Sequence, residues 1–304
     1  MQAEQEIKNK AEKKASGLKT GTKENKKRNR KPIGAGTVVI FVFLSLLVII
    51  FVAPLIWMLL VSVKTNSEIM TSPFGLPKAI QIQNYIDAWT MGKLGIATLN
   101  SVIVCSITLI ITMIAGSMAA FAISRMVWKL SGLTLTYFMI GIMIPVHCVL
   151  IPLFVQFSKV KLTNSLLAII LPYVAFALPM TIYILVGFFG SIPKELFESA
   201  CIDGCGIFKV FFRIALPLAK TGLVVTALMT FVNEWNELLL AMVFISDANK
   251  KTLPVTLTYF VGPYATNYSQ MFAAIIIAIA PSIIVYCCFS NQIVDGLTQG
   301  AVKG

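Results

Sequence analysis

The stretch Ser191–Leu218, which reads SIPKELFESACIDGCGIFKVFFRIALPL, is a polar and charged loop between two long apolar segments. A chain that only had to cross a bilayer would not need such a loop. Ser191 can cap a helix, Pro193 suits a first helical turn, and Glu195 and Glu198 suit the positive end of a helix dipole. These residues predict a short helix at the start of the loop.

The predicted helix carries one apolar stripe. Its members recur at the spacing of a helical face, and they are Leu196, Phe197, Ala200 and Cys201. Gly204 and Gly206 then allow the backbone to turn, and a second segment begins at Ile207 and ends at Pro217. An ordinary interfacial connector fits this pattern as well as an amphipathic helix that docks in a groove of a partner.

The composition places the chain in a membrane. Of its 304 residues, 57% are hydrophobic and only 12% are charged, which is too apolar for a soluble domain of this size. We therefore predict an all-α membrane protein with six transmembrane helices, each long enough to cross a bilayer at about 20 residues. The predicted spans are Thr37–Val63, Leu94–Ile123, Leu133–Phe157, Leu166–Gly190, Thr221–Ile245 and Met271–Ser290.

Charge asymmetry predicts the topology. Residues 1–36 carry 11 Lys or Arg against 4 Glu, directly before the first span, so they are expected to form a disordered cytoplasmic tail that faces lipid rather than nucleic acid. With that tail inside, the cytoplasmic segments hold 18 basic residues and the external ones hold 7. The expected organisation is a first transmembrane helix at 37–63, an extracellular segment at 64–94, a transmembrane domain at 95–290 with the cytoplasmic loop 191–218, and a cytoplasmic C-terminal tail at 291–304.

The sequence lacks the motifs of an enzyme. It has no G-x-x-x-x-G-K-[ST] phosphate-binding loop, no nucleophile elbow and no H-E-x-x-H helix. The lone histidine, His147, lies in a predicted span and is more typical of a packed helix residue than of a catalyst. Cys201 and Cys205 have no further Cys or His nearby, so no metal site is expected. We expect no catalytic residue and no cofactor in this chain.

Two carboxylates in the fifth predicted span are costly to bury. Glu234 and Glu237 lie near its middle, next to Asn233 and Asn236, and an isolated carboxylate there costs about 2.5 kcal/mol or more on insertion scales. A water-accessible translocation path lined by these four residues explains them. A helix kink or a hydrogen-bonded cluster that only supports the fold explains them equally well.

Prolines punctuate the third and fourth predicted spans. Each removes a backbone donor, so we expect Pro145, Pro152, Pro172 and Pro179 to interrupt these helices where they line a cavity.

The loop Ser191–Leu218 resembles the EAA loop of ABC-importer permeases, whose core is Glu-Ala-Ala, a Gly a few residues later, and an Ile-x-Leu-Pro ending. Here the matching segments are Glu198-Ser199-Ala200, Asp203-Gly204 and Ile214-Ala215-Leu216-Pro217. Further segments are similar to the maltose-type inner permease branch, in register from about residue 95 to the C-terminus; they are Ile192–Leu196, Leu162–Ser165, Trp235–Glu237, Thr252–Pro254 and Gly296–Gly304. Ser199 and Cys205 depart from the pattern, since the family usually has Ala at both.

The resemblance implies a type I ABC-importer permease fold and a cytoplasmic coupling helix near Glu195–Gly204 that docks on an ATP-binding subunit. The coupling residues that it implies are Glu195, Leu196, Phe197, Glu198, Ser199, Ala200, Asp203, Gly204, Leu216 and Pro217. It also implies a plasma-membrane sugar importer with alternating access, in which this chain pairs with a second, different permease, two ATPase copies and an extracellular sugar-binding protein. ATP hydrolysis belongs to the partner subunit.

An ion-coupled secondary transporter of a small solute is the alternative. It predicts acids near broken helices and an inverted repeat between the two halves of the chain. The sequence instead places two acids in one helix and has no evident repeat.

Overall fold

The computed structural model describes residues 35–262 and 267–301, so most of the predicted basic tail lies outside the described residues. Regular structure in the described part is helical, with no β-strand among its elements. The described part of the chain divides into two compact units, one ending at Ala53 and the other beginning at Pro54. The functional features described below all lie in the second unit.

Four described helices are each long and apolar enough to cross a membrane on their own. They are α2 (Ala35–Ser62), α5 (Leu94–Arg125), α8 (Leu167–Gly190) and α15 (Tyr268–Ala301). α15 continues well beyond Ser290, where we expected the last span to end. Large apolar side chains along α2 are exposed, as they are on a helix that faces lipid.

Two further spans are broken rather than straight. Helices α6 (Ser131–Ile142) and α7 (Val146–Lys159) meet at 91°, and the segment Ile207–Leu218 meets α12 (Lys220–Trp235) at 78°. If each bent pair is one span, the described part of the chain has six spans. The interruption expected at Pro145 is confirmed, because this proline disfavours helical backbone in the residue before it and a new helix starts after it. Pro152 was also expected to interrupt the third span, but it lies inside α7.

The fifth predicted helix also ends early. α12 ends at Trp235, and a separate helix α13 (Leu239–Phe244) follows after a short turn. In α8, by contrast, the expected interruption is absent, because Pro172 and Pro179 are buried inside one continuous helix. Neighbouring packed helices compensate for the backbone donors that such prolines remove.

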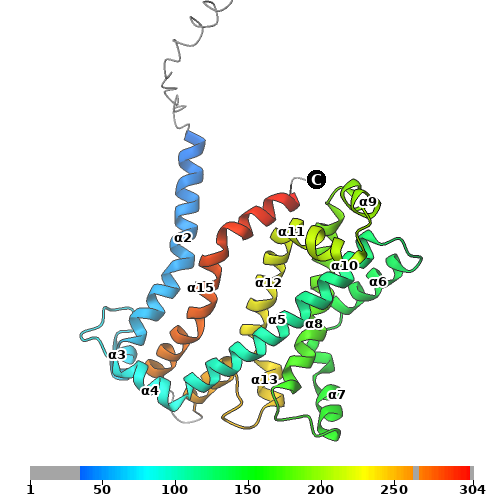
Figure 1. Cartoon of the computed structure of the whole chain (residues 1–304). Helices are drawn as coiled ribbons and strands as arrows, with labels where there is room; N and C mark the ends of the chain where they lie inside the picture. Colours follow the sequence, from blue (N-terminus) through cyan, green and yellow to red (C-terminus); the bar gives the residue numbers. More distant parts are fainter. Residues whose placement is uncertain (1–34, 263–266, 302–304) are drawn as a thin grey trace, which may run out of the picture. The chain divides into compact units, whose positions relative to one another are not determined.

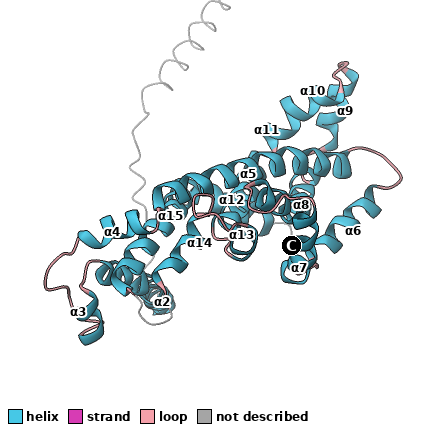
Figure 2. Ribbon diagram, turned by 90° about the horizontal axis from the view of Figure 1, so that it is seen from below, coloured by secondary structure: helices cyan, strands magenta, loops and turns pink. Residues whose placement is uncertain are grey.

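The remaining elements are short, and Figure 2 labels the helices among them. They are α3 (Asn66–Thr71), α4 (Gln83–Met91), α9 (Lys194–Ile202), α10 (Ile207–Val210), the π-helical turn η1 (Phe211–Ala215), α11 (Leu216–Leu218), α14 (Leu253–Thr256) and the 3₁₀ turn η2 (Leu257–Phe260). Helix α4 lies near the start of α5, and α9 lies near its end (Figure 1).

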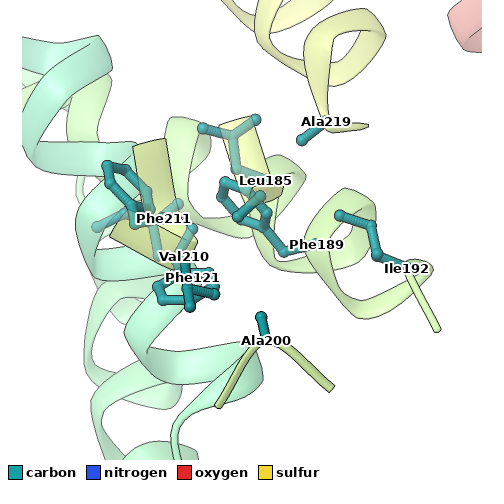
Figure 3. Close-up of a cluster of buried hydrophobic side chains, with 11 residues drawn as sticks. Phe121, Leu185, Phe189, Ile192, Ala200, Val210, Phe211 and Ala219 are labelled. Carbon is teal, nitrogen blue, oxygen red and sulfur yellow. The ribbon is translucent and has the colours of Figure 1, made fainter. Parts of the chain in front are cut away.

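The close packing of α5 on α8 organises the second unit. A Cβ atom on Gly116 of α5 would lie 2.5 Å from the Cγ2 atom of Thr181 in α8, so only glycine permits this approach. Near the end of α5, Phe121 packs with Phe189 of α8 and Phe211 of η1 in a buried hydrophobic cluster (Figure 3). This cluster joins the long helices to the loop Ser191–Leu218.

Candidate functional site

Helix α9 begins without a side-chain cap. Ser191 ends α8 instead, since its hydroxyl donates to the carbonyl of Phe188 at 2.8 Å, so the expectation that it caps the loop helix was wrong. Pro193 is the residue before the first turn of α9, with extended backbone, and Glu195 lies in that first turn. The acidic start of the helix therefore relies on the helix dipole and on whatever contacts it from outside.

A Schellman turn ends α9. The N–H of Cys205 donates to the carbonyl of Ala200 at 2.9 Å, and the N–H of Gly204 donates to that of Cys201 at 3.0 Å. Gly204 has φ of +74°, a left-handed conformation that residues with a Cβ atom adopt only at a cost. Gly206 has ordinary extended backbone, with φ of −67°, so only the first of the two glycines makes the turn.

The predicted apolar stripe of α9 divides between two faces. Phe197 and Ala200 pack inward on the hydrophobic cluster around Phe121. Leu196 is 46% exposed, and Cys201 is also exposed, and neither residue belongs to this cluster.

The outer face of α9 combines acidic and apolar side chains. Glu195, Glu198 and Ser199 are exposed there, and Ile202 is 86% exposed at the end of the helix. Ile202 was not predicted as part of this surface, although its spacing of four residues from Glu198 places both on one helical face. An exposed surface of this composition is typical of a helix that a partner covers.

The second half of the loop is a short helical segment with a π-helical turn in its middle. Val210, Phe211 and Ala215 are buried, while Phe208 is exposed. The N–H of Leu216 donates back to the carbonyl of Phe211, which makes a π-helical turn just before Pro217. A wider turn accommodates a proline, because the ring would otherwise collide with a carbonyl of the preceding turn. Leu216 is half-buried, and Pro217 is exposed before the sharp bend into α12.

Glu237 holds the break between α12 and α13. Its carboxylate accepts hydrogen bonds from the Tyr173 hydroxyl at 2.5 Å, the Leu240 N–H at 2.8 Å and the Ala241 N–H at 3.2 Å. The two N–H groups are unpaired donors at the start of α13, and a carboxylate is a favourable acceptor there. This geometry supports the scaffold interpretation for Glu237.

Glu234 and Asn233 have different surroundings. Together with Thr181, Thr226 and Thr230, they line a cavity of about 190 Å³ between α8 and α12. The Thr181 hydroxyl is buried and has no hydrogen-bond partner within the described chain. The three threonines were missed, although the hydroxyls at 226 and 230 lie four residues apart on the face of Glu234. Such a cavity can accept a ligand with several hydroxyl groups.

Asn236 lies apart from Glu237 and from the cavity that Asn233 and Glu234 line. Its amide donates to the carbonyl of Val232 at 2.8 Å, and its side chain lines a separate cavity of about 380 Å³ with residues of η2 and α15. Neighbouring Trp235 is buried, and its indole N–H donates to the carbonyl of Ala278 at 3.0 Å. The four polar residues predicted to share one path therefore lie in three separate environments.

The fold has a close counterpart among solved structures. A bacterial ABC transporter involved in the import of the acidic polysaccharide alginate contains a chain that superposes with a TM-score of 0.73, covering 84% of this chain and 95% of that one at 20% identity. The two chains therefore share a fold.

Sequence comparison is more specific. Residues 112–295 match the model of the family described as the binding-protein-dependent transport system inner membrane component, and the chain belongs to that family. The matched segment includes the loop at 191–218, α12 and α13, so these candidate features lie within the family region.

Relatives match over most of their length. The diacetylchitobiose uptake system permease protein NgcG of Streptomyces coelicolor is 36% identical over 259 residues, which cover 84% of this chain and 85% of that protein. The probable ABC transporter permease protein YurM of Bacillus subtilis is 36% identical, with 92% and 93% covered. The trehalose/maltose transport system permease protein MalG of Thermococcus litoralis is 34% identical, with 85% and 94% covered.

Proposed function

We propose that this chain is the permease subunit of an ATP-driven importer of a sugar or oligosaccharide. Relatives with 36% and 34% identity carry names that state uptake of diacetylchitobiose and of trehalose or maltose. The chain's own contribution is half of the translocation pathway. It pairs with a second, different permease, while two ATP-binding subunits supply the energy and an extracellular binding protein delivers the sugar.

The two-sided helix α9 is the observation that carries the coupling role. Its inner side, Phe197 and Ala200, belongs to the core of the permease, while its outer side exposes Glu195, Glu198 and Ile202. An amphipathic helix of this kind suits a groove with an apolar floor and a basic rim. The Schellman turn at Gly204 fixes the direction in which the second half of the loop leaves the docked helix. Movement of the ATP-binding subunit then reaches the membrane helices through this loop.

The orientation follows from charge. Both termini and the loop at 191–218 lie on the cytoplasmic side, because the segments on that side carry 18 of the 25 Lys and Arg residues. The ATP-binding subunit is consequently on the same side as α9, and the binding protein approaches the opposite end.

The cavity between α8 and α12 is our candidate for the part of the path in this chain. Asn233, Glu234 and the hydroxyl groups of Thr181 and Thr230 supply hydrogen-bonding groups that a sugar can use during passage. Glu237 contributes to the same path indirectly, by holding the helix break beside it.

Charge reversal on the outer face of α9 tests the proposal. Glu198→Lys is expected to abolish both co-purification of the ATP-binding subunit with tagged permease and ATP-dependent uptake of radiolabelled diacetylchitobiose, maltose or trehalose. Lys159→Glu, an exposed reversal at the far end of α7, is the control and should leave co-purification intact. Unchanged co-purification with Glu198→Lys would contradict the coupling role. Uptake that survives ATP depletion but collapses with the proton gradient would contradict the importer class.

A further inference from the structure

Arg125, the last residue of α5, is bound to the junction between α8 and α9. Its Nε donates to the carbonyl of Phe189 at 2.8 Å and its Nη2 donates to the same carbonyl at 2.5 Å. Nη2 also donates to the carbonyl of Ile192, two residues before the first residue of α9. The Phe189 carbonyl also accepts the N–H of Ile192 at 3.1 Å. The guanidinium therefore reinforces the turn that ends α8 and adds a donor to the Ile192 carbonyl in the connection to α9.

The same guanidinium also contacts α9 itself. It lies over the ring of Phe197, with 5.3 Å between its central carbon and the ring centroid. A residue that only capped α8 would need the two carbonyls and nothing more. The contact with Phe197 therefore adds a direct link from α5 to the inner side of the proposed coupling helix.

A second residue of α5 reinforces that link. Phe121, one helical turn before Arg125, has its ring centroid 5.9 Å from that of Phe197 and 5.3 Å from that of Phe211 in η1. Figure 3 shows Phe121 with Phe211 and Phe189 in the buried cluster. One turn of α5 thus touches both halves of the loop. Because protein interiors are close-packed, a displacement of α9 cannot be absorbed at this contact without moving α5.

The other end of α5 is bound to an opposite loop. Asn100 donates to the carbonyls of Asn249 and Lys251 at 2.9 and 3.0 Å, and the N–H of Leu253 donates to the Ser101 hydroxyl at 2.8 Å. The 32 residues of α5 extend over about 48 Å at the rise of an α-helix. One continuous helix therefore joins the coupling loop to the far side of the protein.

We propose that Arg125 is a positioning residue that holds the coupling helix α9 to α5, so that movement of the docked ATP-binding subunit is passed along α5 to the opposite face. The proposal rests on the coupling function proposed above. It assigns α5, rather than the bend between α11 and α12 alone, as the route by which the loop drives the membrane helices.

The test compares transport with ATP consumption in the complete importer. The complex is isolated through a tag on this chain and reconstituted in nanodiscs for ATP hydrolysis, and uptake of radiolabelled diacetylchitobiose, maltose and trehalose is measured in the same cells. For Arg125→Gln, hydrolysis should stay close to the wild-type rate while uptake per ATP falls by about tenfold, within the usual range of allosteric coupling. Arg125→Lys should restore part of the ratio. Lys129→Gln, which removes the neighbouring exposed charge, should leave it unchanged.

Two results would overturn the proposal. One is an unchanged ratio of uptake to hydrolysis in Arg125→Gln, and the other is a parallel fall of both quantities, which is what a purely structural clamp gives. If Arg125→Gln fails to assemble, Phe197→Leu removes the ring beneath the guanidinium and keeps its carbonyl bonds, and an unchanged ratio there also refutes the role. Failure of the importer function itself looks different, because the wild-type complex would then show no ATP-dependent uptake.

Discussion

Replacing Gly204 isolates the contribution of one backbone angle to coupling. Its φ of +74° lies in the left-handed region, which costs a residue with a Cβ atom about 1–2 kcal/mol. A Cβ atom built on Gly204 meets no heavy atom within 4 Å, so Gly204→Ala introduces strain without a collision. Any change in behaviour is therefore attributable to the turn and not to packing.

The strain has a predictable size in a binding assay. A penalty of about 1–2 kcal/mol lowers the population of the native turn relative to competing loop conformations by a factor of about 5–30. Because only the native turn presents α9 correctly, the affinity of the permease for its ATP-binding subunit should weaken by up to the same factor. Titration of labelled ATP-binding subunit against permease in nanodiscs measures this directly.

Two comparison variants make the reasoning refutable. Gly206→Ala changes composition in the same way two residues later, but φ there is −67° and a Cβ atom also meets nothing within 4 Å, so its affinity should match the wild type. Gly204→Asn should lie between the two, because Asn tolerates left-handed backbone better than Ala does. Equal affinities for the alanine variants at 204 and 206 would refute the role of the turn.

Two further predictions concern the membrane helices, and thermal unfolding of the solubilised protein measures both. Glu237→Gln should lower the free energy of unfolding by about 1–3 kcal/mol, because an amide nitrogen replaces one of the two acceptor oxygens. Tyr173→Phe, which removes one donor to that carboxylate, should cost less. A Glu234→Gln variant that is as unstable as Glu237→Gln would contradict the capping role of Glu237. Gly222→Ala should lower the free energy of unfolding by about 1–3 kcal/mol through overpacking, because the new Cβ atom would lie 2.3 Å from the ring of Phe188 in α8. Gly187→Ala is the control and should not destabilise the protein, because its Cβ atom would meet nothing within 4 Å.

The loop shows what sequence patterns can predict. Gly204 between two short amphipathic segments predicts the turn, because few residues other than glycine adopt its backbone angle readily. The sequence predicted that α9 is amphipathic but did not predict which of its apolar residues are buried. Phe197 and Leu196 are equally apolar, and which of them is buried depends on where α5 and α8 end, which local spacing does not encode.

Tertiary contacts decide the features that the sequence did not predict. Four polar residues separate the apolar parts of α12 and α13, and a helix kink was one of two interpretations of them, but the sequence does not show that Trp235 ends a helix or that Glu237 caps the next one. Pro145 signals a break but carries no information on the 91° angle, which packing sets. Arg125 was interpreted only as a topological charge, since its partners lie 64 and 67 positions later in the chain.

The separation of the two sides of α9 has a consequence for engineering. The proposed coupling role assigns recognition of the ATP-binding subunit to outward residues such as Glu195, Glu198 and Ile202, and none of these belongs to the buried cluster around Phe121. A few substitutions on the outer side of α9 could therefore change which transporter's ATP-binding subunit the permease binds, while Phe197 and Ala200 keep the helix packed on the buried cluster. In such a chimera, the outer side of this nine-residue helix would set which ATP-binding subunit binds, while its inner side would keep the permease folded.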